Sequence, residues 1–128
     1  MPDPNPSRPV GPYTPIVRAG DWLVVSGQLG LRDGKLVDGG VEAQATQAVQ
    51  NLSALLATEG AALGAVRKTT VFLVDIADYA AMNAAYTEAF GEHRPARSAI
   101  AVAGLPLGGL VEIEAWAYVG LHDSPGNG

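Results

Sequence analysis

The sequence predicts an α+β domain in which two helices pack on one face of a mixed β-sheet, in the chain order β-β-α-β-α-β-β. Hydrophobic spacing supports this prediction. Residues 110–119 alternate between apolar and polar side chains, as in a half-buried strand, whereas apolar residues in 41–56 recur at steps of three and four, as in an amphipathic helix. Two helices cannot cover both faces of a sheet this wide, so we expect one face to be open.

The size and composition fit one domain. The chain has 128 residues, of which 48% are hydrophobic and 16% are charged. We assign residues 10–120 to the domain and expect the proline-rich start, residues 1–9, and the tail, residues 121–128, to be flexible. Cysteine is absent, which excludes disulfides and thiol nucleophiles and is compatible with a cytoplasmic protein. No apolar run approaches the roughly 20 residues of a membrane span.

The first half of the chain predicts two strands, a turn and a helix. Residues 13–31 contain two short strands around a turn at 19–21, and the stretch "RDGK" at 32–35 indicates a second turn. The helix begins near Val41 and ends near Glu59, and Gly60 is available as its C-terminal cap.

The second half predicts a strand from Val66, a second helix capped by Asp78, and two further strands over 96–103 and 110–119. Gly91 lies just past the end of the second helix. One face of this helix carries Tyr79, Met82, Tyr86 and Phe90.

The last strand indicates how the open face of the sheet is covered. Trp116 and Tyr118 alternate with the apolar residues of this strand and therefore point away from the helices. Aromatic side chains of this kind are enriched in protein interfaces. We therefore expect a homo-oligomer that closes through its sheets.

Several classes of function are disfavoured. The formal net charge of −5 argues against a nucleic-acid binder. The two histidines are His93, which has only Glu92 close to it, and His122 in the tail, so no metal site is expected. Ser26 lacks the flanking glycines of a nucleophile elbow.

Arg97 and Glu112 each allow two interpretations. Arg97 precedes the small, apolar stretch "SAIAVAG". It is either a strand-start charge paired with Glu92 or with solvent, or a fixed receptor for a carboxylate. Most surface charges are only solvated, which favours the first interpretation. Glu112 either faces water or is desolvated at an interface, where its pKa would rise and it could transfer protons. Tyr13 is either a surface aromatic or the wall of a pocket.

Six stretches occur together in the order and spacing of one protein family. They are "GPYT" at 11–14, "VSGQL" at 25–29, "EAQATQAVQNL" at 42–52, "VRKTTVFLVDIADYAAMNAAY" at 66–86, "PARS" at 95–98 and "VEIEAWA" at 111–117. With these stretches the chain closely resembles the RidA-type (reactive intermediate deaminase) family from about residue 10 to residue 119.

The resemblance implies a chorismate-mutase-like (bacillus type) α+β fold and a homotrimer with three ligand sites in the clefts between subunits. It also implies hydrolysis of reactive 2-imino or 2-enamino acids, of the 2-iminobutanoate or 2-iminopropanoate type, to 2-oxo acids and ammonia. No metal or organic cofactor is implied.

The resemblance also assigns site residues. The family's carboxylate-binding arginine falls on Arg97, and the acid that positions the attacking water falls on Glu112. The pocket tyrosine falls on Tyr13, the backbone that lines the site on Gly27, and a supporting helix side chain on Asn83. A main-chain group near Ala99 would help to hold the water.

The chain departs from the best-known deaminases at three positions. They often carry Cys or Thr where this chain has Ala99, an acidic residue at Ala101 and Arg at Gly104. Ala99 removes a polar contact beside the proposed water, so these departures bear on the choice of substrate.

Three other functions remain open at this point. The first is a non-catalytic binder of small carboxylates, which needs Arg97 but not Glu112. The second is RNA cleavage, which the acidic balance disfavours. The third is a deaminase dedicated to one enamine of a degradation pathway.

Overall fold

The computed structural model describes residue 9 and residues 11–120. The arm expected over 1–9 and the tail expected over 121–128 lie outside the described residues, apart from residue 9. The strands are β1 (Ile16–Ala19), β2 (Trp22–Leu29), β3 (Leu31–Arg32), β4 (Lys35–Leu36), β5 (Val66–Leu73), β6 (Ala96–Ala101) and β7 (Val111–Tyr118). The helices are α1 (Gly40–Thr58) and α2 (Tyr79–Phe90), with short 3-10 turns at Leu63–Ala65, Ile76–Asp78 and Pro106–Gly108.

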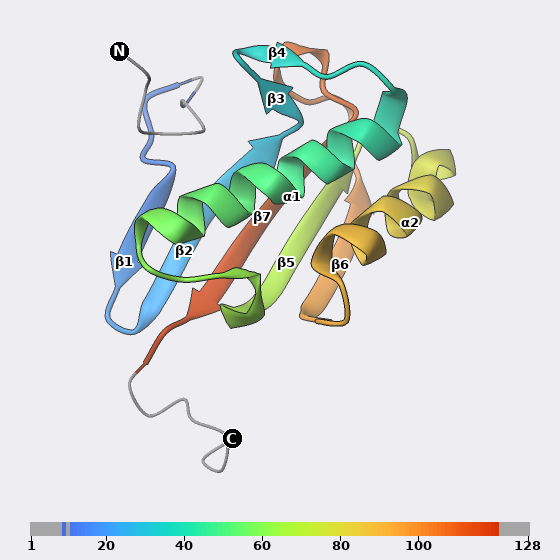
Figure 1. The fold of residues 1–128 in the computed structure, drawn as a ribbon. Coiled ribbons are helices and arrows are strands. Elements are labelled where there is room, and N and C mark those ends of the chain that lie inside the picture. The colour runs from blue at the N-terminus through green and yellow to red at the C-terminus, as the bar shows by residue number, and fades with distance from the viewer. Residues whose placement is uncertain (1–8, 10, 121–128) are drawn as a thin grey trace.

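Five of the strands form one mixed sheet in the order β1-β2-β7-β5-β6. β5 and β6 are parallel and the other neighbours are antiparallel. Both helices lie on the same face of this sheet, α1 across the central strands and α2 beside β5 and β6 (Figure 1). This arrangement confirms the predicted α+β class with one face left without helices.

The core lies between the helices and the sheet. Alternate residues of each central strand point into it, as the period of two requires. The largest of these side chains on the strands are Leu23, Val25, Val66, Val71, Leu73, Val111 and Ile113. The helices contribute Val49, Leu52, Leu55, Leu56 and Met82. Each of these side chains is at most 1% exposed, and burying one contributes about 1.5–3 kcal/mol to folding.

The ends of the helices agree with the prediction at the C-termini but not at Asp78. Gly60 has a φ of 75° and donates to the carbonyl of Ala57, while the Ala61 N–H donates to that of Leu56, which completes a Schellman cap. Asp78 precedes α2, but its side chain makes no capping hydrogen bond. Instead Asp75 accepts a hydrogen bond from the Ala77 N–H at 2.9 Å, because a 3-10 turn is inserted before the helix.

The structure adds two short strands, β3 and β4, to those predicted and shortens a third, β6. The turn "RDGK" is flanked by β3 and β4, which pair as a small hairpin outside the main sheet. Asp33 and Gly34 both have positive φ, of 55° and 78°, as the tight hairpin turn requires. Each of these strands has two residues, too few for a visible alternation. The strand expected over 96–103 ends at residue 101, because its partner β5 ends at Leu73.

Candidate active site

Glu112 lies against a glycine of the neighbouring strand. The pairing of β2 with β7 is irregular between Val25 and Gln28, so Gly27 lies in a bulge, and Glu112 pairs with Leu29 two residues further along β2. A Cβ atom placed on Gly27 would come within 2.6 Å of the Glu112 Cδ atom. Glycine is therefore the residue that lets the Glu112 carboxylate lie over β2, and Gly27 and Glu112 form one corner of the candidate site.

The Glu112 carboxylate is half-buried and lacks a compensating charge. Burial raises its pKa, and the nearby Glu114 carboxylate raises it further. In the part of the chain that the structure describes, no side chain or backbone group donates a hydrogen bond to it. A carboxylate in this state is a stronger base than an ordinary surface glutamate, which suits it to accepting a proton from water.

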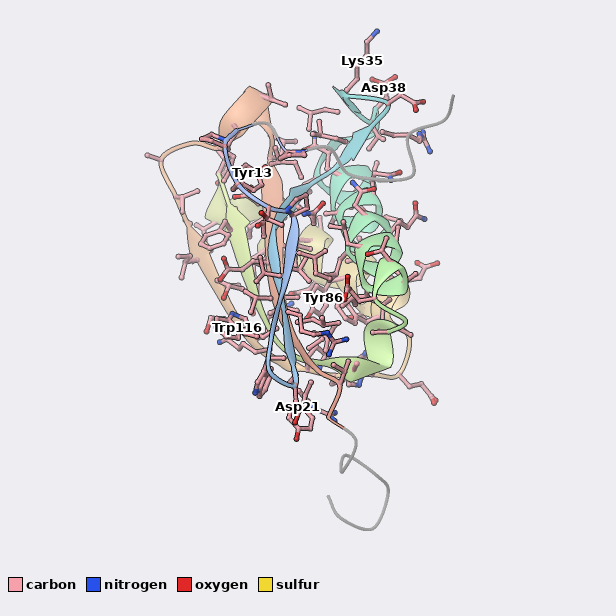
Figure 2. The ribbon with its side chains drawn as sticks, turned by 90° about the vertical axis from the view of Figure 1, so that its left-hand side faces the viewer. Tyr13, Asp21, Lys35, Asp38, Tyr86 and Trp116 are labelled. Atoms are coloured by element: carbon pink, nitrogen blue, oxygen red, sulfur yellow. The ribbon has the colours of Figure 1, made fainter. Side chains whose placement is uncertain are left out.

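Tyr13 belongs to the same side of the sheet. It lies in the segment that leads into β1, and its side chain is 42% exposed. Ser26 ties this segment to β2, because its Oγ donates to the Thr14 carbonyl at 2.8 Å and its N–H donates to the Pro15 carbonyl at 2.9 Å. Figure 2 shows that Tyr13 and Trp116 both lie on the side of the sheet that faces away from α1.

Arg97 lies on the other side of the sheet, on the edge strand β6, and reaches α2. Its Nη2 donates a hydrogen bond to the Tyr79 hydroxyl at 3.1 Å, and its Nη1 lies 3.9 Å from the Met82 sulfur. The guanidinium carbon also lies 4.9 Å from the ring centre of Tyr86 and 5.6 Å from that of Tyr79. Helix α2 therefore fixes the position of this charge.

The interpretation of Arg97 as one half of a surface ion pair does not hold. Within residues 11–120 no carboxylate, that of Glu92 included, forms an ion pair with Arg97. A guanidinium has five N–H donors, and only two of its nitrogens are engaged by α2. Arg97 therefore keeps donors available for an anion.

Asn83 and Ala99 lie near Arg97. Asn83 is one helical turn beyond Tyr79 on the same stripe of α2, and its Oδ1 is buried without a hydrogen-bond partner. A buried, unpaired acceptor costs about 1–3 kcal/mol, so this atom is a natural recipient for a donor from outside the chain. Ala99 pairs with Val71, two positions after Arg97, and therefore points to the same face.

The two groups of residues do not meet within one chain. Arg97 pairs with Thr69 of β5, while Glu112 pairs with Phe72, three residues further along. An odd offset places the two side chains on opposite faces of the sheet. With strands about 4.8 Å apart and a rise of about 3.3 Å per residue, their Cα atoms are roughly 14 Å apart.

Two tyrosines beside Arg97 were not predicted as site residues. Tyr79 and Tyr86 were placed on the apolar face of the second helix, and their spacing of seven residues does bring them to one side of it. The sequence contains no signal that Arg97, eleven residues after Tyr86, would pack against both rings, because that contact depends on the parallel pairing of β5 with β6.

The comparisons with known proteins agree with these observations. The family model described as Endoribonuclease L-PSP matches residues 5–119, nearly the whole chain. The chain belongs to the RidA family, which is also called the YjgF, UK114, RutC or L-PSP family. A 2-iminobutanoate/2-iminopropanoate deaminase of Capra hircus is 44% identical over 113 residues, which cover 87% of this chain and 82% of that protein.

Solved structures of RidA proteins have the same fold. RidA from the Antarctic bacterium Psychrobacter matches with a TM-score of 0.86 and 36% identity over 93% of this chain and 98% of that one. TdcF of E. coli, solved with bound serine, matches with a TM-score of 0.84 and 32% identity over 92% and 96% of the two chains. The predicted chorismate-mutase-like fold is thereby confirmed.

Residues 11–120 contain neither a candidate metal site nor a candidate membrane-spanning helix. No group of three or more His, Cys, Asp and Glu residues in this range could hold a metal ion. None of the helices described there combines the length and apolar character needed to cross a membrane. His93 has a structural contact instead, because its Nε2 lies 2.7 Å from the Val66 carbonyl oxygen.

Proposed function

We propose that this RidA protein hydrolyses reactive 2-imino or 2-enamino acids to 2-oxo acids and ammonia, at sites shared between the subunits of a homotrimer. The observation that carries this proposal is the guanidinium of Arg97, which α2 holds in place and which has no carboxylate partner within residues 11–120. A held arginine with free donors matches a substrate carboxylate in charge and shape. The relatives named as iminobutanoate deaminases support the choice of reaction.

The size of the substrate requires that the proposed site be formed by two chains. The carboxylate and the imine carbon of a 2-imino acid are directly bonded, so the groups that bind them have to lie within a few ångströms of each other. Arg97 and Glu112 of one chain are on opposite faces of the sheet. We therefore assign Arg97, Asn83 and a main-chain group near Ala99 to one subunit, and Glu112, Gly27 and Tyr13 to its neighbour.

The open face of the sheet supports such an assembly. It leaves four large hydrophobic side chains between 37% and 48% exposed on four different strands, namely Val17, Trp22, Ile100 and Trp116. Trp22 and Trp116 contact each other edge to face, with ring centres 6.3 Å apart. A preformed apolar surface with aromatic side chains is typical of a subunit interface.

The proposed reaction needs two groups of the protein: Arg97, which binds the substrate carboxylate, and Glu112, which accepts a proton. Arg97 binds the carboxylate, and the imine nitrogen enters protonated, which makes its carbon electrophilic. Glu112 takes a proton from a water molecule as the water oxygen bonds to that carbon. Glu112 then gives this proton to the nitrogen of the adduct. As the C–N bond breaks and ammonia leaves, the hydroxyl of the adduct loses its proton to Glu112 and the C=O bond forms. Positioning supplies much of the acceleration, because the substrate is already reactive.

A non-catalytic binder is the nearest alternative, because it would use the same Arg97. The two functions differ in their need for Glu112, which a binder does not require. RNA cleavage has some support in the description of the family model, but the net charge of −5 opposes it. A cytoplasmic location remains an expectation, with which the cysteine-free composition is compatible.

The test is a coupled assay. An amino-acid oxidase generates imines from several amino acids while semicarbazide traps each imine, and the protein competes by hydrolysing it. We expect wild type to suppress semicarbazone formation and Arg97→Ala and Glu112→Ala to lose this effect. Arg32→Ala and Glu88→Ala remove exposed charges of the same types elsewhere and serve as matched controls.

The outcomes separate the alternatives. If Glu112→Ala binds a carboxylate such as propionate as wild type does but has no activity, the deaminase is supported. If wild type binds propionate yet leaves every imine untouched, the protein is a binder. Binding of RNA that weakens steeply with salt, measured on nuclease-free protein, would support the third function instead.

A further inference from the structure

We propose that the hydroxyl group of Tyr79 is a positioning element for Arg97, and that it sets how tightly the site holds a substrate carboxylate. This inference rests on the proposed role of Arg97 as the carboxylate receptor. Tyr79 is the first residue of α2, and its side chain is 41% exposed, so it stands at the rim beside the guanidinium. Its hydroxyl is the one oxygen of residues 11–120 that accepts a hydrogen bond from Arg97.

The contacts of Arg97 divide into two kinds. The rings of Tyr86 and Tyr79 attract the positive charge, but a cation–π contact depends mainly on distance and leaves the direction of each N–H largely free. The hydrogen bond from Nη2 to the Tyr79 hydroxyl, at 3.1 Å, depends on direction. The contact of Nη1 with the Met82 sulfur, at 3.9 Å, is with a weak acceptor. Tyr79 is therefore the strongest constraint on the orientation of the guanidinium plane.

Tyr86 is held much more firmly than Tyr79. Its hydroxyl lies 2.7 Å from the Thr69 hydroxyl, its ring centre lies 4.6 Å from that of Phe90, and it is only 4% exposed. Burial raises the pKa of Tyr86 despite the opposing hydrogen bond with Thr69 and the nearby charges of Arg97 and Arg94. The Tyr86 ring is thus held in place beneath the Arg97 guanidinium. The Tyr79 hydroxyl, in contrast, can be removed without disturbing the core.

The orientation matters because of how a carboxylate binds. Two parallel N–H groups on one edge of the guanidinium form the paired hydrogen bonds to a carboxylate. When the Tyr79 hydroxyl engages Nη2, that edge faces one direction before the substrate arrives. Without the hydroxyl the group rotates among several orientations, and binding has to select one of them. Preorganisation of this kind improves affinity by reducing the entropy lost on binding.

The decisive variant is Tyr79→Phe, which keeps the ring and removes the hydroxyl. We expect the KM for a 2-imino acid to rise about threefold to tenfold, which is the range for loss of one modest hydrogen bond, while kcat changes less than about twofold. We also expect the dissociation constant of propionate, measured by calorimetry on the intact protein, to rise by a similar factor.

A spectroscopic measurement tests the mechanism without turnover. In ¹⁵N-labelled protein the Arg97 side-chain signals report rotation of the guanidinium group, and we expect faster rotation in Tyr79→Phe than in wild type. The matched control is Tyr79→Phe added to Arg97→Lys. Because an ammonium group has no plane to orient, the second substitution should change propionate binding by less than about twofold in that background.

The results distinguish a failure of the proposed role of Arg97 from a failure of the role of Tyr79. If wild type neither binds propionate nor hydrolyses imines, the proposed function of Arg97 fails. If wild type does both and Tyr79→Phe has unchanged KM, propionate affinity and guanidinium rotation, only the role of Tyr79 fails. A Tyr79→Phe protein with lowered thermal stability and kcat but an unchanged KM would show a structural role, and that result also overturns the inference.

Discussion

The two faces of the sheet differ in what covers them. Neighbouring residues of one strand point to opposite faces and therefore have different surroundings. On β7, Ile113 and Ala115 are fully buried under the helices, while Trp116, between Ala115 and Ala117, is 45% exposed on the open face. The same division separates Arg97, which packs against α2, from Glu112, which lies over Gly27. The hydrophobic core under the helices is thus closed within one chain, whereas the open face keeps large apolar side chains such as Trp116 exposed.

The strongest test of this contrast compares two adjacent residues. Ala115→Glu would put a charge into the core, where it has no partner, and should prevent folding. Trp116→Glu should leave each chain folded but abolish the proposed trimer and its activity. Circular dichroism and light scattering measure the two effects. A folded Ala115→Glu protein or a trimeric Trp116→Glu protein would contradict the contrast.

The assignment of the site to two chains can be tested by mixing inactive variants. Arg97→Ala and Glu112→Ala chains, combined at equal amounts by co-refolding, should recover up to about a quarter of wild-type activity, because random mixing puts both intact residues in that share of the clefts. Each variant refolded alone is the control. If the two residues acted within one chain, mixing would recover no activity.

Disturbing the contact between Gly27 and Glu112 should have a smaller effect, which is confined to activity. Gly27→Ala would press on the carboxylate and should lower kcat on the order of tenfold, with thermal stability within a few degrees of wild type, because the crowding atoms belong to one side chain. Gly64→Ala is the matched control, since a Cβ there would meet nothing within 4 Å. If the two variants had equal activities, the claim that Gly27 makes room for the Glu112 carboxylate would be wrong.

The smallest expected effect concerns the pH dependence of stability. Because folding raises the pKa of Glu112, the folded state favours its neutral form, and the wild-type chain loses stability as the pH rises through that pKa. Glu112→Gln lacks this loss. We expect its melting temperature to match that of wild type near pH 3 and to exceed it progressively towards pH 7.

Glu88→Gln, on the exposed side of α2, is the control for this measurement. A constant difference between Glu112→Gln and wild type across the pH range would mean that the Glu112 carboxylate is equally well solvated in the folded and unfolded chains.

The fold could be predicted in most respects from local patterns. The period of two in β7 and the period near 3.6 in α1 fixed which residues face the core, and Gly60 and Gly91 marked the helix ends because their positive φ values suit glycine. The β3–β4 hairpin and the capping role of Asp75 were missed, because two-residue strands and an inserted 3-10 turn leave no periodic signal.

Candidate site residues could be named from the sequence, but their arrangement could not. The sequence by itself determined the α+β class, the face to which each strand residue points, and the family motifs that contain Arg97 and Glu112. Only the tertiary structure decided that these two residues are on opposite faces, that Gly27 lies under Glu112, and that Tyr79 holds Arg97. These relations depend on the order β1-β2-β7-β5-β6, on a three-residue offset along β5 and on a bulge in β2. Such pairings join segments far apart in the chain, and local propensity carries no information about them.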